Sequence, residues 1–373
     1  MGDNGKIQYV FNEVKHLFCA VFMVFAVIFS GNAFGAVCAS GEYDDGGVCK
    51  TCDMGYYCVE DIKYQCESGK ITAVSGASDV SQCENPEFVL TTTALKAGDK
   101  IQFKMSAVGE FVVDWGDGTA PQTIVRTGTK NETYSHSYIN AGTYVVGISG
   151  QATGYSTNEK DAAISFADNN LISGISGSLG AIFGTLTDGS QPRFIQTFRK
   201  CTNLSGEIPG NLFEGIFGVS VSQMFKEMFK ECKMLTGTIP GSLFADLSGA
   251  PAKDMFSSMF SGCSGLTGFI PPDLFAGFSN TDHSAGSMKQ MFEKTSLSTS
   301  CPDGYVQHVT GFESEIGSVV SCDLLSITIL WDADNGAESF TTQCAVDGDI
   351  VLPTPPEKRG YTFTGWKLIT VTE

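Results

Sequence analysis

The sequence predicts a multidomain chain that is mainly β and carries an α/β solenoid of repeats at residues 162–298. Three observations lead to this prediction. Six cysteines are concentrated in residues 38–83, short alternating strands fill residues 87–161, and a 31-residue period is repeated within residues 162–298. A chain of 373 residues also fits roughly two to four domains of ordinary size. In chain order we expect a disulfide-rich module, a β-sandwich, the solenoid and a small C-terminal unit.

The charge balance excludes one class of partner. The chain has 41 Asp and Glu residues against 23 Lys and Arg, which gives a formal net charge of −18. Such a charge repels the phosphate backbone of nucleic acids and anionic membrane surfaces. Charged residues make up only 17% of the chain, as is typical of extracellular β-rich and repeat proteins. Nucleic acid is therefore not an expected partner.

Residues 1–35 are predicted to be a secretory signal peptide. Residues 17–29 form a thirteen-residue apolar run with two lysines before it. Ala33 and Gly35 stand at the positions that a signal peptidase recognises when it cuts before Ala36. A helix that crosses a bilayer needs about twenty apolar residues, so this run is short for a membrane span.

Two membrane-anchored alternatives remain at this end of the chain. One is an uncleaved signal anchor. The other is a lipoprotein anchor at Cys38, which is disfavoured because Val37 stands where a small residue is expected. We therefore expect a secreted or cell-surface protein with no stable membrane span after cleavage.

Residues 36–86 are predicted to be a disulfide module. Its cysteines are Cys38, Cys49, Cys52, Cys58, Cys66 and Cys83. In an exported chain, an even number of cysteines in so short a segment indicates disulfides, because the segment cannot bury enough apolar surface to fold unaided. Three bridges allow fifteen connectivities. Zinc is the alternative, but Cys49 and Cys52 form the one C-x-x-C pair and no histidine lies near it.

The pattern CASGEYDDGGVCKTCDMGYYC, followed by CESGKITAVSGASDVSQC, resembles the ephrin-receptor-like and tumour-necrosis-factor-receptor-like cysteine-rich modules. In those families a C-x-x-G-x-Y turn recurs beside each bridge. The resemblance implies an extracellular module without catalytic activity.

Residues 87–161 are predicted to form a β-sandwich, because several short strands alternate with Gly, Asn and Thr turns. VVDWGDGT at residues 112–119 and YSHSYINAGTYVVGI at residues 134–148 resemble a polycystic-kidney-disease-type domain. In that family W-G-D-G-T closes a turn and H-x-Y-x-x-x-G-x-Y enters a late strand.

Asp114 and Asp117 raise the alternative of a calcium site, since hard cations prefer carboxylate oxygens. Only two carboxylates stand in this motif, so we interpret them as turn residues that make local hydrogen bonds. His136 and Tyr138 are interpreted as strand residues that pack within the sandwich.

Residues 162–298 contain near-copies of one unit. Three sets of residues recur 31 positions apart: Phe198, Phe229 and Phe260; Cys201, Cys232 and Cys263; and Leu204, Leu235 and Leu266. Each unit is predicted to form a helix of two to three turns, because its apolar residues follow the i, i+3, i+4, i+7 rule. A short strand with the pattern L-T-G-x-I-P follows. Stacking of units would bury the Met-Phe stripe as core and the three cysteines as thiols rather than as metal ligands.

The pattern M-F-x-x-C-x-x-L-T-G-x-I-P, at residues 228–240 and 259–271, resembles the leucine-rich repeats of bacterial surface antigens, and the resemblance covers residues 170–297. The resemblance implies a solenoid that binds proteins or glycans. Any ligand preference is expected in the variable residues, such as Lys226 and Glu227 in one copy against Ser257 and Ser258 in the next.

Two segments complete the chain. Residues 299–325 are expected to be a connector closed by a disulfide between Cys301 and Cys322, which caps the array. Residues 326–373 end in R-G-Y-T-F-T-G-W and resemble the internalin-type B repeat, a small β-grasp-like unit of bacterial surface proteins. This resemblance implies a stalk or contact module.

No motif supplies a nucleophile with a base, a pair of catalytic carboxylates, a phosphate-binding loop or a metal cage. We therefore predict a non-catalytic bacterial surface or secreted protein, without a cofactor, that adheres to an extracellular protein or glycan through its repeats. A structural envelope or stalk component without a specific ligand is the alternative. An enzyme would need convergent polar residues in one loop, and the sequence shows none.

Overall fold

The computed structural model describes residues 37–67, 69–279, 286–302, 305–324, 326–331, 340–345 and 354. This described part of the chain is mainly β, with few and short helices and four disulfides. The predicted signal peptide, residues 1–35, lies outside the described residues, as does most of the segment assigned to the B repeat. Among the described residues, no helix combines the length and the apolar character that a membrane crossing requires.

The cysteine-rich module consists of two small hairpins, β1 (Glu42–Asp44) with β2 (Cys49–Thr51) and β3 (Tyr56–Val59) with β4 (Ile62–Gln65). A short 3-10 turn, η1 (Val80–Gln82), follows. The structure confirms the predicted disulfides and selects one connectivity, in which neighbours in sequence pair: Cys38–Cys49, Cys52–Cys58 and Cys66–Cys83.

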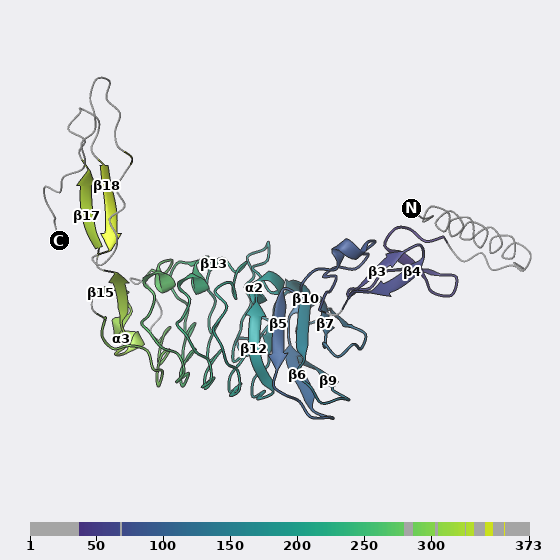
Figure 1. The fold of residues 1–373 in the computed structure, drawn as a ribbon, viewed down its shortest axis with the longest axis horizontal. Helices are drawn as coiled ribbons and strands as arrows, with labels where there is room; N and C mark the ends of the chain where they lie inside the picture. Colours follow the sequence, from purple (N-terminus) through teal and green to yellow (C-terminus); the bar gives the residue numbers. More distant parts are fainter. Residues whose placement is uncertain are drawn as a thin grey trace, which may run out of the picture.

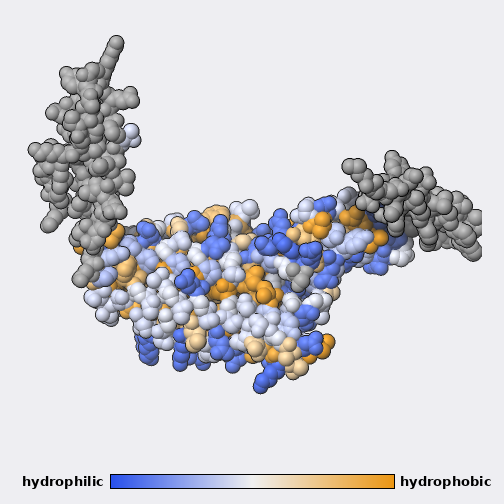
Figure 2. Space-filling model, viewed as in Figure 1, coloured by the Kyte–Doolittle hydropathy of each residue, from blue (hydrophilic) through white to orange (hydrophobic). Residues whose placement is uncertain are grey.

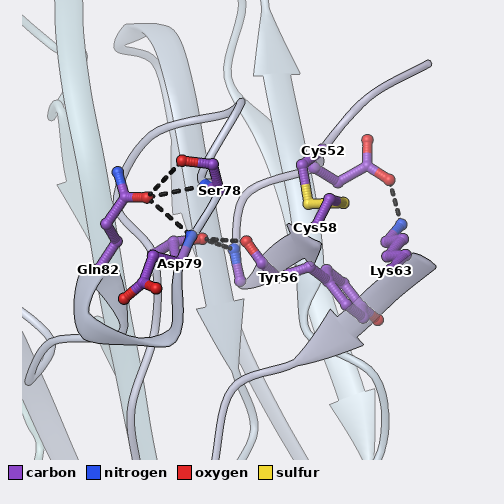
Figure 3. The surroundings of a disulfide bond; sticks show 10 residues. Cys52, Tyr56, Cys58, Lys63, Ser78, Asp79 and Gln82 are labelled. Atoms are coloured by element: carbon purple, nitrogen blue, oxygen red, sulfur yellow. Dashed lines mark hydrogen bonds and ion pairs between the residues drawn. A yellow bond between two sulfur atoms is a disulfide. The ribbon is translucent and has the colours of Figure 1, made fainter. Parts of the chain in front are cut away.

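Polar contacts hold the loops around these bridges (Figure 3). The Lys63 ammonium forms an ion pair with Asp53 and lies 4.1 Å from the centre of the Tyr56 ring. Gln82 accepts hydrogen bonds from the amides of Ser78 and Asp79, at 2.7 and 3.1 Å, and so closes the η1 turn. The apolar contribution is small: Met54 and Ile71 form a cluster with Val112 of the neighbouring sheet. Covalent closure is therefore the main constraint on this module.

The sandwich contains two antiparallel sheets (Figure 1). One has the order β12-β5-β10-β7-β8, from strands Ile172–Gly177, Phe88–Thr92, Val145–Gly154, Val108–Asp114 and Gln122–Arg126. The other has the order β11-β6-β9, from strands Ile164–Ser165, Lys100–Met105 and Glu132–Ser137. Side chains of β6 alternate between exposed and buried, as period-two strands require. Phe103 points into the core and packs against Trp115, Tyr134 and Phe166.

Both sheets extend past residue 161, where the sequence placed the end of the sandwich. β11 pairs with β6, and β12 pairs with β5, although both strands lie in the segment assigned to the repeats. Phe88 of β5 contacts Phe166 and Phe198, so the hydrophobic core continues from the sheets into the repeats.

The structure contradicts the helix predicted in each repeat. The Met-Phe-Cys half is instead a series of tight turns, in which every fourth residue has a left-handed backbone: φ is 60° at Gln223, 54° at Glu227 and 64° at Glu231. Met228 N–H donates to the Phe225 carbonyl within its own repeat, whereas Phe229 N–H donates to Met259 of the next repeat. A helix would satisfy its amides internally. Here half of them join neighbouring repeats.

The prediction failed because four-residue turns present the same face as a helix. In a helix these positions, i, i+3, i+4 and i+7, share one face, and in the four-residue turns the same positions are the buried ones. The spacing of Phe225, Met228, Phe229 and Cys232 therefore identified the buried side, and all four are buried, but it did not identify the backbone conformation.

Equivalent side chains stack along the repeats. The Phe198, Phe229 and Phe260 rings lie 5.4 and 5.7 Å apart and are nearly parallel. Parallel bridges join Gly206 to Leu235 and Gly237 to Leu266 in the L-T-G half. We call the described part of residues 178–298, which follows the last strand of the sandwich, the repeat stack. Its short elements are α2 (Leu179–Ile182), β13 (Gly218–Val219), η2 (Gly241–Phe244), β14 (Leu247–Ser248) and η3 (Pro272–Phe275).

The connector closes the far end of the repeat stack (Figure 1). It comprises β15 (Tyr305–His308), α3 (Glu313–Ile316) and β16 (Ser321–Leu324). The predicted Cys301–Cys322 disulfide is present, Ile270 bridges to Ser321, and Phe312 contacts Phe275. Beyond it, β17 (Ser326–Trp331) pairs antiparallel with β18 (Phe340–Ala345).

Candidate binding surface

A polar groove lies where the sandwich meets the repeat stack. Its volume is about 380 Å³, and its lining includes Gln102, Lys104, Thr133, Lys160, Asp168 and Gln196. That volume falls at the lower end of the range of about 300–1,000 Å³ typical of ligand pockets. The groove takes residues from β6, from β9 and from the first turns of the repeats, so it exists only because these regions share one core.

Strand alternation places the polar residues of the groove. Phe103 and Met105 of β6 point into the core, which leaves Gln102 and Lys104 on the outer face. Antiparallel pairing then sets Lys104 opposite Thr133 of β9 and beside Ser165 of β11. The sequence K-I-Q-F-K-M shows this alternation, but only the register between strands shows which residues meet.

The two lysines of the groove are not part of an ion pair among the described residues. No carboxylate lies within ion-pair distance of the Lys104 or Lys160 ammonium in the part of the chain that the structure describes. Asp168, the acidic residue of the lining, is paired with Arg199 across a distance of 3.3 Å. The lining therefore combines two lysines that are not ion-paired with one aspartate that is.

A row of charged side chains continues from the groove across the repeat stack. Glu227 accepts a hydrogen bond from Gln196 at 2.7 Å, pairs with Lys230 at 2.8 Å, and lies 3.8 Å from Arg199. Lys226 pairs with Asp254 of the third copy at 3.1 Å. We call these residues, with Arg199, the charged row.

Glu227 is the centre of the charged row. Partial burial raises the pKa of its carboxyl, but hydrogen bonds from Lys230 and Gln196 and the charges of Lys230 and Arg199 outweigh that effect. The pKa of Glu227 therefore lies below its usual range, and the carboxylate stays ionised at neutral pH.

The third copy interrupts the charged row. Its corresponding residues, Ser257, Ser258 and Ser261, are only 9%, 6% and 7% exposed. Lys226 and Glu227 thus stand at the repeat positions of Ser257 and Ser258, which the sequence had singled out as variable. This variation lies in the tight turns of the Met-Phe-Cys half, and Glu227 is joined to the groove through its hydrogen bond with Gln196.

The sandwich motif residues form a separate, structural cluster. Asp117 accepts hydrogen bonds from Thr119 and contacts His136 at 2.7 Å, and His136 stacks on Trp115. The Tyr138 hydroxyl donates to the Trp115 carbonyl, and burial raises the pKa of this phenol. Burial also raises the pKa of Asp117, but its hydrogen bonds outweigh this and lower it. These contacts fix the W-G-D-G-T turn against β9.

Asp114 likewise accepts a hydrogen bond from the Gly116 amide at 2.9 Å, as expected of a turn residue. Among the described residues, no three His, Cys, Asp or Glu side chains converge on a point that could hold a metal ion.

A second, apolar groove of about 250 Å³ lies between two successive units of the repeat stack. Phe213, Leu243 and Phe244 line it. Figure 2 shows apolar residues across the middle of the stack and hydrophilic residues along its lower edge. Near this groove in sequence, Phe217 and Val219 are 55% and 68% exposed.

The predicted cysteine sites have structural roles. All eight candidates are paired in disulfides, whereas Cys201, Cys232 and Cys263 are buried thiols. Burial raises the pKa of the Cys201 and Cys263 thiols to about 12.

Comparison with known proteins found no match among protein-family models, curated proteins or solved structures.

Proposed function

We propose that this chain is a non-catalytic secreted or cell-surface protein that binds an extracellular protein or glycan through the polar groove and the charged row. The proposal retains the interpretation of residues 162–298 as a solenoid of bacterial surface-antigen type. The flanking modules then act as spacers and contact units. Four disulfides support an oxidising, extracellular location.

The observation that carries the proposal is the continuity of the groove with the charged row. Asp168 and Gln196 line the groove, and Arg199 and Glu227 connect those two residues to the second copy. A polar surface on a rigid, repetitive scaffold suits recognition of a large ligand. The described residues of this surface lack a hydrogen-bonded nucleophile and base, which an enzyme of the acyl-transfer type would need.

The third copy provides a matched variant for the test. Lys226→Ser, Glu227→Ser and Lys230→Ser together give the second copy the serines that the third copy already carries, so the turns should fold unchanged. The purified chain, with its disulfides intact, would be applied to a panel of matrix proteins and glycans. We expect at least one panel member to bind, and we expect the triple variant to bind it about tenfold more weakly.

Lys233→Ala is the control, because Lys233 is exposed and lies outside both the groove and the charged row. If no panel member binds the native chain, the structural alternative replaces the adhesive one. That alternative is favoured by one observation: the sandwich seals one end of the repeat stack and the connector seals the other.

A further inference from the structure

We propose that the polar groove binds an anionic saccharide, with Lys104 and Lys160 as the residues that receive its negative group. This inference rests on the proposed function and assigns it a ligand class. It follows from the two lysines of the groove, from the hydrogen-bonding groups left free within it, and from the lack of an exposed aromatic ring among the described residues of its lining.

The two lysines without an ion-pair partner favour an anion. Lys104 projects from the outer face of β6. Lys160 lies just before β11, the strand that pairs with β6. Both line the groove, and neither has a carboxylate partner within the described residues. Two carboxylates lie close by: Asp168 is ion-paired with Arg199, and Asp161, which keeps its negative charge, accepts hydrogen bonds from the Asn131 amide at 2.7 Å and the Ser156 hydroxyl at 2.8 Å.

The uncharged groups suit hydroxyls. The Gln196 side chain donates its N–H to Glu227, which leaves its carbonyl oxygen facing away from that bond. Asn131 uses one N–H on Asp161 and keeps its carbonyl oxygen. Thr133 adds a hydroxyl to the lining. A sugar hydroxyl both donates and accepts, so it can pair with amides and hydroxyls alike.

The aromatic residue of the lining, Phe103, is buried to 2% exposure and packs into the core. A neutral sugar would have no exposed ring in this groove on which to stack its apolar face. Recognition must therefore depend on the charge and on the hydrogen bonds, which favours a saccharide that carries carboxylate or sulfate groups. The lysines accept either anion, and only the measurement distinguishes them.

The experiment is titration calorimetry of the full secreted chain with three probes: a hyaluronan hexasaccharide, which carries carboxylates, a heparin hexasaccharide, which also carries sulfates, and neutral maltohexaose. We expect at least one anionic probe to bind, maltohexaose to bind at least tenfold more weakly, and affinity to fall as salt rises. Binding of both anionic probes identifies carboxylate as sufficient, and binding of heparin alone identifies sulfate as required.

Lys104→Gln and Lys160→Gln should each weaken binding of the anionic probe by roughly tenfold, since each removes one charge-assisted hydrogen bond near the surface. Lys233→Gln is the matched control and should leave affinity unchanged. Both test positions are outward-facing, so the fold should tolerate the changes.

Two results would overturn the inference. One is the failure of both anionic probes to bind. The other is binding that Lys104→Gln and Lys160→Gln leave intact. In either case, binding of a panel protein that the charged-row triple variant weakens would leave the proposed function standing, whereas loss of all panel binding would remove the function itself.

Discussion

The cysteine-rich module and the repeat stack reach stability by different routes. The module has three disulfides and buries a cluster of only three apolar residues, one of them supplied by the sandwich. The stack contains three cysteines that remain thiols, and it relies on stacked aromatic rings and on hydrogen bonds between repeats. Covalent closure compensates for a small core, whereas repetition builds a large core from small units.

The largest effect is expected from removing a ring of the aromatic stack. Phe229 contacts both Phe198 and Phe260 and is fully buried. Phe229→Ala should lower the free energy of unfolding of the repeat stack by about 3–5 kcal/mol, because it removes buried area and leaves a cavity in two interfaces. Phe229→Leu should cost clearly less. Urea denaturation followed by hydrogen exchange would measure both, and equal losses for Ala and Leu would contradict the stacking account.

Removing one bridge of the module should have a similar but more local effect. Replacing Cys66 and Cys83 by serine opens a loop that spans 17 positions in sequence. The expected loss is about 3 kcal/mol in the module, because the unfolded chain regains entropy. Amide exchange should rise in residues 42–83 and stay unchanged in the repeat stack. An equal rise of amide exchange in both regions would show that the stability of the repeat stack depends on this disulfide.

Alkaline pH should destabilise the repeat stack through its thiols. Burial raises the pKa of Cys201 and Cys263 from 9.0 to about 12, so the folded state keeps these protons over a range where the unfolded state loses them. Their contribution is therefore full below pH 9 and is lost as pH rises toward 12. Each thiol should cost about 1.4 kcal/mol of stability per pH unit in that window.

Urea midpoints at pH 8 and pH 10 would measure this loss. Cys201→Ala should lower stability at pH 8 and show a shallower decline between the two pH values than the native chain. A decline of unchanged slope would mean that the Cys201 thiol ionises without unfolding.

The smallest change in stability is expected from a substitution at Glu231, which lies in a turn of the second copy. Glu231 has φ of 64°, a left-handed conformation that costs a non-glycine residue about 1–2 kcal/mol. Gly262 occupies the equivalent position in the next copy, with φ of 80°. Glu231→Gly should therefore change stability by less than about 1 kcal/mol, with relief of strain offset by greater freedom of the unfolded chain. Glu231→Val, which adds branching at the same φ, should be clearly destabilising in the same assay.

These residues also show what sequence can predict. Disulfides, the mainly β character and the buried side of each repeat follow from composition and spacing. The turn conformation does not, because Glu227 and Glu231 are residue types that normally favour right-handed backbone. The one indication in the sequence was Gly262, because a glycine at the repeat position of Glu231 is compatible with a left-handed backbone there. The polar groove was also missed, since Lys104, Lys160 and Gln196 meet only through strand register and the stacking of the first repeat.

Hydrogen exchange of the native chain with and without reductant tests the central comparison most directly. Reduction should abolish protection in the two hairpins of the cysteine-rich module. The amides that bond between repeats, such as those of Phe229 and Glu231, should retain their protection, because no disulfide contributes to those contacts. Loss of protection throughout the repeat stack on reduction would contradict the account, since it would show that the stack depends on the bridges rather than on its own packing.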